Sequence, residues 1–146
     1  MNNVQTGPKE LGIFILRLAL GLMFLAHSLI LKIGTFGIEG TVGFFESIGY
    51  PAALAYLVIA MEALGGLFLV LGVQARWVAL ILSPILLGAI PVHSAGWVFN
   101  APDGGWEYPL YLFVLCIVQF LVGDGAYALK PSSPLPMAGN QKKMAN

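Results

Sequence analysis

The chain has very few charged residues and a single cysteine. Only 10% of its 146 residues are Asp, Glu, Lys or Arg, whereas soluble domains carry about a quarter. The seven basic and seven acidic residues cancel, and no basic run is long enough to follow a phosphate backbone. Cys116 alone cannot form an internal disulfide, a CxxC redox pair or a cysteine-based zinc site. The composition therefore excludes a soluble domain and argues against nucleic acid as a partner.

Apolar sequence dominates instead, since 58% of the residues are hydrophobic and the mean hydropathy is +0.85. Four apolar segments cover residues 11–31, 51–73, 77–95 and 108–122, and the last can continue to Leu129. About 20 helical residues cross a hydrocarbon core, and an open sheet would leave its backbone groups unpaired in lipid. The sequence predicts an all-α protein, an integral membrane four-helix transmembrane bundle, with the lipid bilayer as its first partner.

The flanking charges predict the boundaries and the orientation. We expect a cytoplasmic N-terminal tail at 1–10, one transmembrane domain at 11–129, and a proline-rich, disordered cytoplasmic tail at 130–146. Basic residues gather near both ends and in the second connector, which holds Arg76, so the positive-inside rule places both termini in the cytoplasm. The first segment is too long for a signal-peptide core and is expected to be retained. The expected location is the cell membrane, as a multi-pass inner-membrane protein.

Two connectors differ from ordinary solvent loops. In residues 34–49, four apolar side chains at helical spacing predict a short helix that lies in the membrane interface. In residues 96–106, Trp97, Phe99 and Trp106 fit either the headgroup level of the bilayer or stacking on a ligand.

Five ionisable residues lie within the apolar segments or at their ends: Arg17, His27, Glu62, His93 and Glu107. A charged side chain at the centre of a spanning helix costs about 2.5–3.5 kcal/mol, so such residues face the bundle interior, pair, or line a functional cavity. Counting along the helices, we expect Arg17 and Glu62 to form a buried charge pair that serves either helix register or proton handling.

The same count places His27, His93 and Glu107 at one depth near the outer boundary, beneath Trp97 and Trp106. An imidazole can donate to a carbonyl oxygen and pass protons, while a carboxylate orients it. A quinone headgroup has two carbonyls and takes up two protons on reduction, so the cluster suits a quinone. It suits a proton relay in transport equally well. Two histidines can also ligate haem iron, the less favoured cofactor, and no other metal site is predicted.

At these positions the chain resembles the DoxX family of small four-helix membrane proteins. The resemblance spans residues 11–129. It rests on the order and spacing of Arg17-Leu18-Ala19-Leu20-Gly21 with His27 and Lys32, Gly43-Phe44-Phe45 with Gly49-Tyr50-Pro51, Glu62 with Gly65-Gly66 and Leu71-Gly72, His93 with Gly96, and Glu107-Tyr108-Pro109 with Gly123-Asp124-Gly125. It implies a membrane component of oxidoreductase systems, because family members are associated with thiosulfate:quinone oxidoreductase and with complexes that handle oxidative and thiol stress. The chain departs from the family pattern at residues 126–130.

Three functions stay open. The first is a quinone-interacting or redox-supporting subunit of a membrane oxidoreductase or oxidative-stress system. Because the chain has no dinucleotide-binding fingerprint and no cysteine pair, such catalysis would need a soluble or membrane redox partner. The second is a small-molecule or proton-coupled transporter, and the third is a non-catalytic scaffold for soluble redox enzymes. Activity of the chain on its own and a homo-oligomer are both left open.

Overall fold

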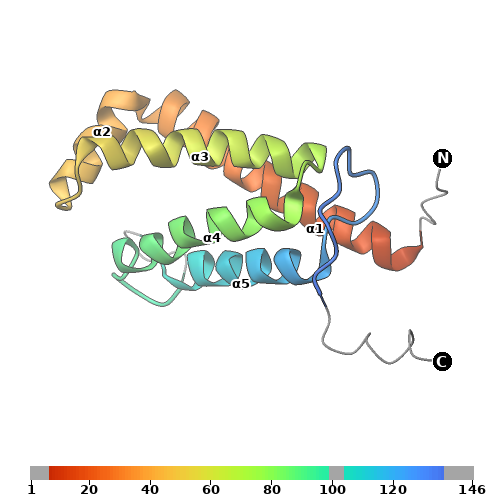
Figure 1. The fold of residues 1–146 in the computed structure, drawn as a ribbon. Helices are drawn as coiled ribbons and strands as arrows, with labels where there is room; N and C mark the ends of the chain where they lie inside the picture. Colours follow the sequence, from red (N-terminus) through yellow and green to blue (C-terminus); the bar gives the residue numbers. More distant parts are fainter. Residues whose placement is uncertain (1–6, 99–103, 137–146) are drawn as a thin grey trace, which may run out of the picture.

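The computed structural model describes residues 7–98 and 104–136, which are mostly helical (Figure 1). The helices are α1 (Pro8–Leu25), η1 (Ala26–Thr35), α2 (Gly37–Ser47), α3 (Ala52–Leu71), α4 (Ala75–Val92) and α5 (Glu107–Val122). Within these described ranges the only β-type pairing is an isolated bridge between Val73 and Lys130. The predicted all-α fold is therefore confirmed.

Three of the helices are long and apolar enough to cross a membrane: the continuous α1–η1 helix of 28 residues, α3 with 20 and α4 with 18. The fourth, α5, has 16 residues but reaches from one end of α4 to the other. Its first residue, Glu107, donates its backbone N–H to the carbonyl of Trp97 beyond the end of α4. Near the start of α4, Arg76 donates to the carbonyl of Phe120 close to the end of α5. The protein is an integral membrane bundle of four helices.

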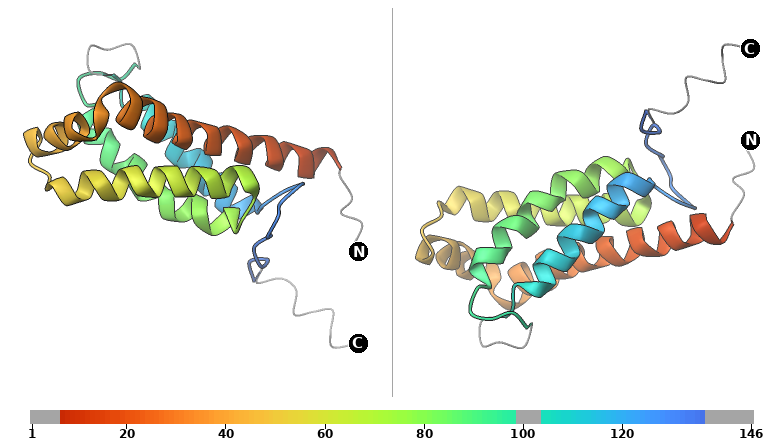
Figure 2. Two further views of the ribbon diagram at one scale, coloured as in Figure 1. Left: turned by 90° about the horizontal axis from the view of Figure 1, so that it is seen from above. Right: turned by 90° about the horizontal axis from the view of Figure 1, so that it is seen from below.

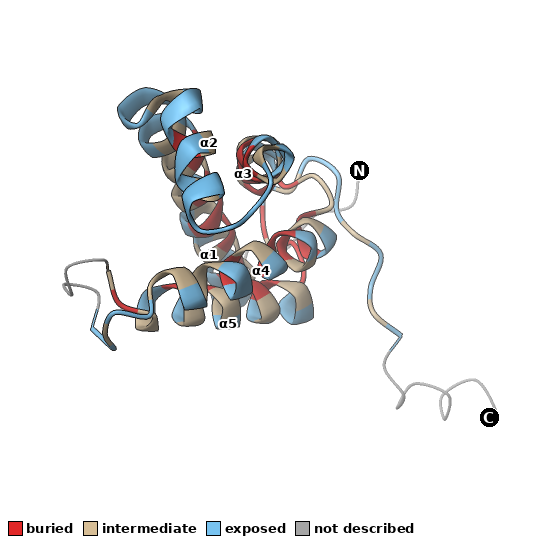
Figure 3. Ribbon diagram, turned by 90° about the vertical axis from the view of Figure 1, so that its left-hand side faces the viewer, coloured by how far each residue is buried: buried red, intermediate tan, exposed pale blue. Residues whose placement is uncertain are grey.

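The four long helices form two antiparallel pairs, α1 with α3 and α4 with α5 (Figure 2). The start of α1 and the segment after α5 lie at one end, which we call the terminal end. Helix α2 packs on η1 and α3 at the opposite end, the α2 end. Buried residues lie on the sides where the helices meet, and exposed residues predominate on the outer sides (Figure 3).

Glycines allow α1 and α3 to approach closely. A Cβ on Gly21 would lie 2.9 Å from the carbonyl oxygen of Gly66, and a Cβ on Gly66 would lie 2.9 Å from that of Gly21. Beside them, Gly65 lies against the side chain of Leu82 from α4. Since lipid provides no hydrophobic drive between spanning helices, such close backbone packing is a main source of their association.

The helix boundaries lie near the predicted ones. The first helix covers residues 8–35 and is longer at both ends than the predicted 11–31. The connector expected to form a short helix does so as α2. The fourth helix ends at Val122, because Gly123 has a φ of 96° that does not continue a right-handed helix.

The segment after α5 is hydrogen-bonded to the terminal end of the bundle. The backbone N–H of Lys130 donates to Gly72, and that of Gln74 donates to Lys130. The backbone N–H of Ser132 donates to the carboxylate of Asp124 at 2.9 Å. The hydrogen-bonded segment thus extends beyond residue 129 into the predicted tail, which begins at residue 130. Residues 1–6 and 137–146 of the predicted tails, and Phe99 in the predicted aromatic connector, lie outside the described residues.

Candidate functional site

A cavity of about 700 Å³ lies at the α2 end of the bundle. Its walls come from α1–η1, α2, α3, α4 and α5 and are mostly aliphatic and aromatic. The polar and titratable side chains that line it are His27, Lys32, Thr41, Glu62, His93 and Tyr108. We call it the main cavity. Small-molecule sites are typically about 300–1,000 Å³, mostly apolar, with a few placed polar groups, and the main cavity has these properties.

The π-helical geometry of η1 places His27 and Lys32 on one wall of the main cavity. In this helix type the backbone hydrogen bonds connect residues five apart, as between the N–H of Phe36 and the carbonyl of Leu31. The wider turn brings residues five positions apart, such as His27 and Lys32, close to the same side of the helix. Turns of this type are frequent at functional sites.

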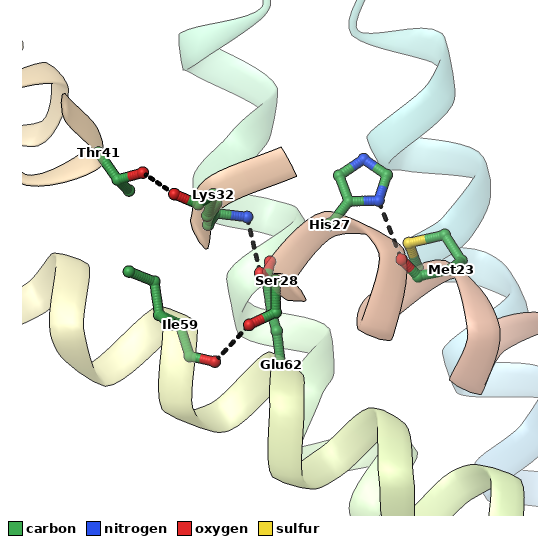
Figure 4. A network of polar contacts seen from close by, with 7 residues as sticks. All are labelled: Met23, His27, Ser28, Lys32, Thr41, Ile59 and Glu62. Atoms are coloured by element: carbon green, nitrogen blue, oxygen red, sulfur yellow. Dashed lines mark hydrogen bonds and ion pairs between the residues drawn. The ribbon is translucent and has the colours of Figure 1, made fainter. Parts of the chain in front are cut away.

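Lys32 and Glu62 form an ion pair in the wall of the main cavity (Figure 4). Lys32 Nζ donates to Glu62 Oε2 at 2.6 Å, and the side chains are 16% and 6% exposed. Close by, the hydroxyl of Ser28 donates to the carbonyl of Ile59 at 2.8 Å. The hydroxyl of Thr41 donates to the carbonyl of Lys32 at 2.9 Å. These contacts fix η1 against α3 on one side and against α2 on the other.

The ion pair predicted between Arg17 and Glu62 is not formed. Arg17 is buried, but its guanidinium donates to the backbone carbonyls of Asp124 at 2.8 Å and Tyr127 at 3.3 Å. A Cβ on Gly72 would meet the Arg17 guanidinium, so Arg17 lies level with the end of α3. From residue 62 to residue 72 a helix rises by about 15 Å. The prediction was wrong because Arg17 reaches the terminal end and Glu62 lies nearer the α2 end.

Both histidines line the main cavity, and each is held by the same kind of contact. Nδ1 of His27 lies 3.0 Å from the carbonyl oxygen of Met23, as Figure 4 shows. Nδ1 of His93 lies 2.9 Å from the carbonyl oxygen of Ala89. Because a carbonyl oxygen only accepts hydrogen bonds, Nδ1 carries the proton in both rings. In the neutral form of either ring the lone pair is then on Nε2.

Neighbouring groups define the surroundings of the two rings. The ring of Tyr108 stacks on that of His27, with centroids 6.2 Å apart and planes at 25°. A Cβ on Gly104 would lie 2.8 Å from Cδ2 and 3.7 Å from Nε2 of His93, so Gly104 packs directly against the ring and only glycine fits there. Tyr108 and Gly104 themselves line the main cavity.

Glu107 is not grouped with the two histidines. It lines a second hollow of about 440 Å³, together with Trp97, Tyr108 and three further residues of α5. Pro109, which lines the main cavity, follows Glu107 by two residues, about 200° around the helix. Glu107 therefore lies on a different side of α5 from the main cavity that the two histidines line, and the three residues do not share one hollow. The rings of Trp97 and Trp106 contact each other edge to face, with centroids 4.2 Å apart.

Sequence reasoning missed Lys32, Thr41 and Tyr108 as site residues. Lys32 had a usable signal, because it is the only basic residue in its connector and follows His27 by five positions. The other two are polar residues at positions where surface exposure is equally compatible with the sequence. No group of three or more His, Cys, Asp or Glu side chains in the described part of the chain is placed to hold a metal ion.

The chain matches a known protein family and a named relative. The DoxX family model matches residues 12–97, which hold His27, Lys32, Glu62 and His93. A protein of Bacillus subtilis (strain 168) named "Putative oxidoreductase CatD" is 35% identical over 124 residues, covering 84% of this chain and 87% of that protein. No solved structure matches the chain. With more than half of its length matched and a relative of this identity, the chain belongs to the DoxX family.

Proposed function

We propose that this protein is a quinone-interacting, redox-supporting subunit of a membrane oxidoreductase or oxidative-stress system. The observation that carries the proposal is the main cavity, in which His27 and His93 stand in largely apolar walls. Membership in the DoxX family and a relative named as an oxidoreductase support the redox setting.

The main cavity suits the shape and chemistry of a quinone headgroup. The headgroup is a flat ring that packs against aliphatic and aromatic side chains, and its two oxygens need polar partners. His27 on η1 and His93, directly after the end of α4, each line the cavity with a ring nitrogen atom. The ammonium of Lys32 is a further donor, held in place by Glu62.

The mouth of the main cavity suits an amphipathic ligand. Phe36 and Phe44 line the cavity yet are 59% and 49% exposed, so the cavity opens between η1 and α2. A headgroup can enter there while its isoprenoid tail stays in lipid. The positive-inside rule, with both termini cytoplasmic, would set this opening toward the outer face of the cell membrane.

A partner subunit completes the proposed system. The chain has one cysteine, Cys116, and no dinucleotide-binding fingerprint. We therefore assign the exchange of electrons with the quinone to a soluble or membrane partner, and the binding of the headgroup to this chain.

A binding titration tests the proposal. The protein is purified in mild detergent and titrated with a short-chain quinone analogue, with binding read from tryptophan fluorescence. Removing an aromatic ring from the cavity wall loses its packing against the headgroup, about 0.5–1.5 kcal/mol, so His27→Ala and His93→Ala should each lower the affinity by about two- to tenfold. Ile30→Ala is the matched control, because Ile30 lies on η1, is 68% exposed and does not line the cavity.

Two outcomes would count against this site. If folded wild-type protein binds no analogue, the quinone proposal fails, and a scaffold that recruits partners through Trp97 and Trp106 becomes the better explanation. If Glu107→Gln weakens binding and the histidine variants do not, the ligand occupies the second hollow instead.

A further inference from the structure

The main cavity presents hydrogen-bond acceptors where an oxidised quinone needs donors. We infer that it binds the reduced dihydroxy form, the quinol, more tightly than the oxidised dicarbonyl form. This inference rests on the proposed quinone site and specifies the redox form that the site favours.

The first acceptor is Nε2 of His27. The ring donates its Nδ1 proton to the carbonyl of Met23 at 3.0 Å, and a neutral imidazole has only one such proton. Nε2 then carries a lone pair, and Figure 4 shows this nitrogen on the side of the ring away from Met23. It has no hydrogen-bond partner among the residues that the structure describes.

The second acceptor is Nε2 of His93, which directly follows the end of α4. Its Nδ1 is held by the carbonyl of Ala89 at 2.9 Å, four residues earlier, which repeats the contact of His27 with Met23. Gly104 packs so closely against the Cδ2 side of the ring that only glycine fits there, and the ring itself lines the main cavity. Two separate elements thus fix an imidazole in the same tautomer beside one cavity.

The two redox forms of the ligand differ in what they offer these nitrogens. A quinol has two O–H groups, each of which can donate to an Nε2 lone pair. A quinone has only carbonyl oxygens, so its lone pairs would face those of the imidazoles, and an unpaired polar group in an apolar site is costly.

The other polar groups of the cavity do not reverse this balance. The hydroxyl of Thr41 donates to the carbonyl of Lys32, and the ammonium of Lys32 donates to Glu62. The remaining N–H groups of Lys32 can donate to an oxygen atom of either redox form, so they do not distinguish quinone from quinol. The titratable and charged groups around the two histidines are Lys32 from η1, Glu62 from α3 and Tyr108 from α5.

Three probes on the full-length protein in mild detergent, kept anaerobic, test the inference. They are a short-chain benzoquinol, the corresponding quinone, and the dimethyl ether of the quinol, which has the same ring but no O–H donor. At pH 8 we expect the quinol to bind about two- to tenfold more tightly than its ether for each hydroxyl hydrogen bond made. We also expect it to bind more tightly than the quinone.

Two variants localise the effect. His27→Phe and His93→Phe keep a ring of similar size and remove the acceptor, so each should lower the quinol-to-ether affinity ratio with little change in the affinity for quinone. Ile30→Phe on the exposed side of η1 is the matched control and should leave the ratio unchanged. The quinol-to-ether and quinol-to-quinone affinity ratios are measured on the wild-type protein, so the test stands even if a variant fails to fold.

The outcomes separate the inference from the proposed function. Equal or tighter binding of the quinone at pH 8, or an unchanged quinol-to-ether ratio in both histidine variants, overturns the inference and leaves the quinone site intact. Failure of the folded wild-type protein to bind any of the three probes overturns the proposed function itself.

Discussion

Lys32 of η1 and Glu62 of α3 form an ion pair at 2.6 Å, with both side chains largely withdrawn from the surface. Removing one partner leaves the other charge buried and uncompensated, which costs about 3–5 kcal/mol for a well-buried pair. Lys32→Met should lower the free energy of unfolding by an amount at the lower end of that range. The double variant Lys32→Met/Glu62→Gln should lose less. Unfolding in detergent, followed by circular dichroism, measures both.

Lys9→Met is the control for the loss of a lysine, because Lys9 is exposed at the start of α1 and its substitution should change stability by less than about 0.5 kcal/mol. If the double variant lost as much free energy of unfolding as Lys32→Met and Glu62→Gln lose together, the two side chains would not interact.

The burial of Arg17 predicts its effect on the segment after α5. Its guanidinium holds the carbonyls of Asp124 and Tyr127, so Arg17→Met should loosen residues 123–130. Hydrogen bonds to charged groups contribute about 1.5–3 kcal/mol. Amide exchange of Ala126 and Lys130 should therefore accelerate by about tenfold or more, as measured by hydrogen exchange with mass spectrometry.

Arg17→Lys keeps the charge but has fewer donors and should give an intermediate rate. Exchange within α4 serves as the internal reference and should not change. Identical protection of residues 126–130 in the wild type and in Arg17→Met would contradict the contact.

The close approach of α1 and α3 predicts different responses among the glycines. A Cβ at Gly21 or Gly66 would meet the backbone of the other helix at 2.9 Å, so Gly21→Ala and Gly66→Ala should destabilise the bundle by about 1–3 kcal/mol. Gly88 on α4 is the matched control, because a Cβ there meets nothing within 4 Å in the described part of the chain. Gly88→Ala should be neutral or slightly stabilising. Equal losses at all three positions in thermal unfolding would refute the packing explanation.

Charge asymmetry predicts that the terminal end lies in the cytoplasm. In a Cys116→Ala background, a cysteine at Ser47 of α2 should react with an impermeant thiol reagent added to intact cells. A cysteine at Gln74, in the connector between α3 and α4, should react only after permeabilisation. The reverse pattern of labelling would show the opposite orientation.

Hydropathy was sufficient to predict the architecture, because each spanning helix must be apolar over most of its length. The short helix α2 was predictable for a related reason, since its apolar residues recur at helical spacing. The depth of His27 and His93 along their helices likewise brought both to one end of the bundle. These features depend on local sequence alone.

The partners of the buried charges could not be predicted in the same way. Arg17 binds backbone carbonyls that lie 107 and 110 residues away, and a carbonyl acceptor has no signature in the sequence. The π-helical turns of η1 add residues to each turn, which changes the face on which Lys32 emerges. Depth along a helix also says nothing about direction around it, and that direction separates Glu107 from the two histidines.

Photoaffinity labelling with an azido-quinone in native membranes tests the central claim most directly, since it reports where the headgroup binds. Peptides that contain His27 to Phe45 or Leu86 to His93 line the main cavity and should carry the label. An excess of unlabelled quinone analogue should suppress that labelling. Label confined to Tyr111 and Val114 beside the second hollow, or label on the main-cavity peptides that the analogue does not suppress, would contradict a quinone site in the main cavity.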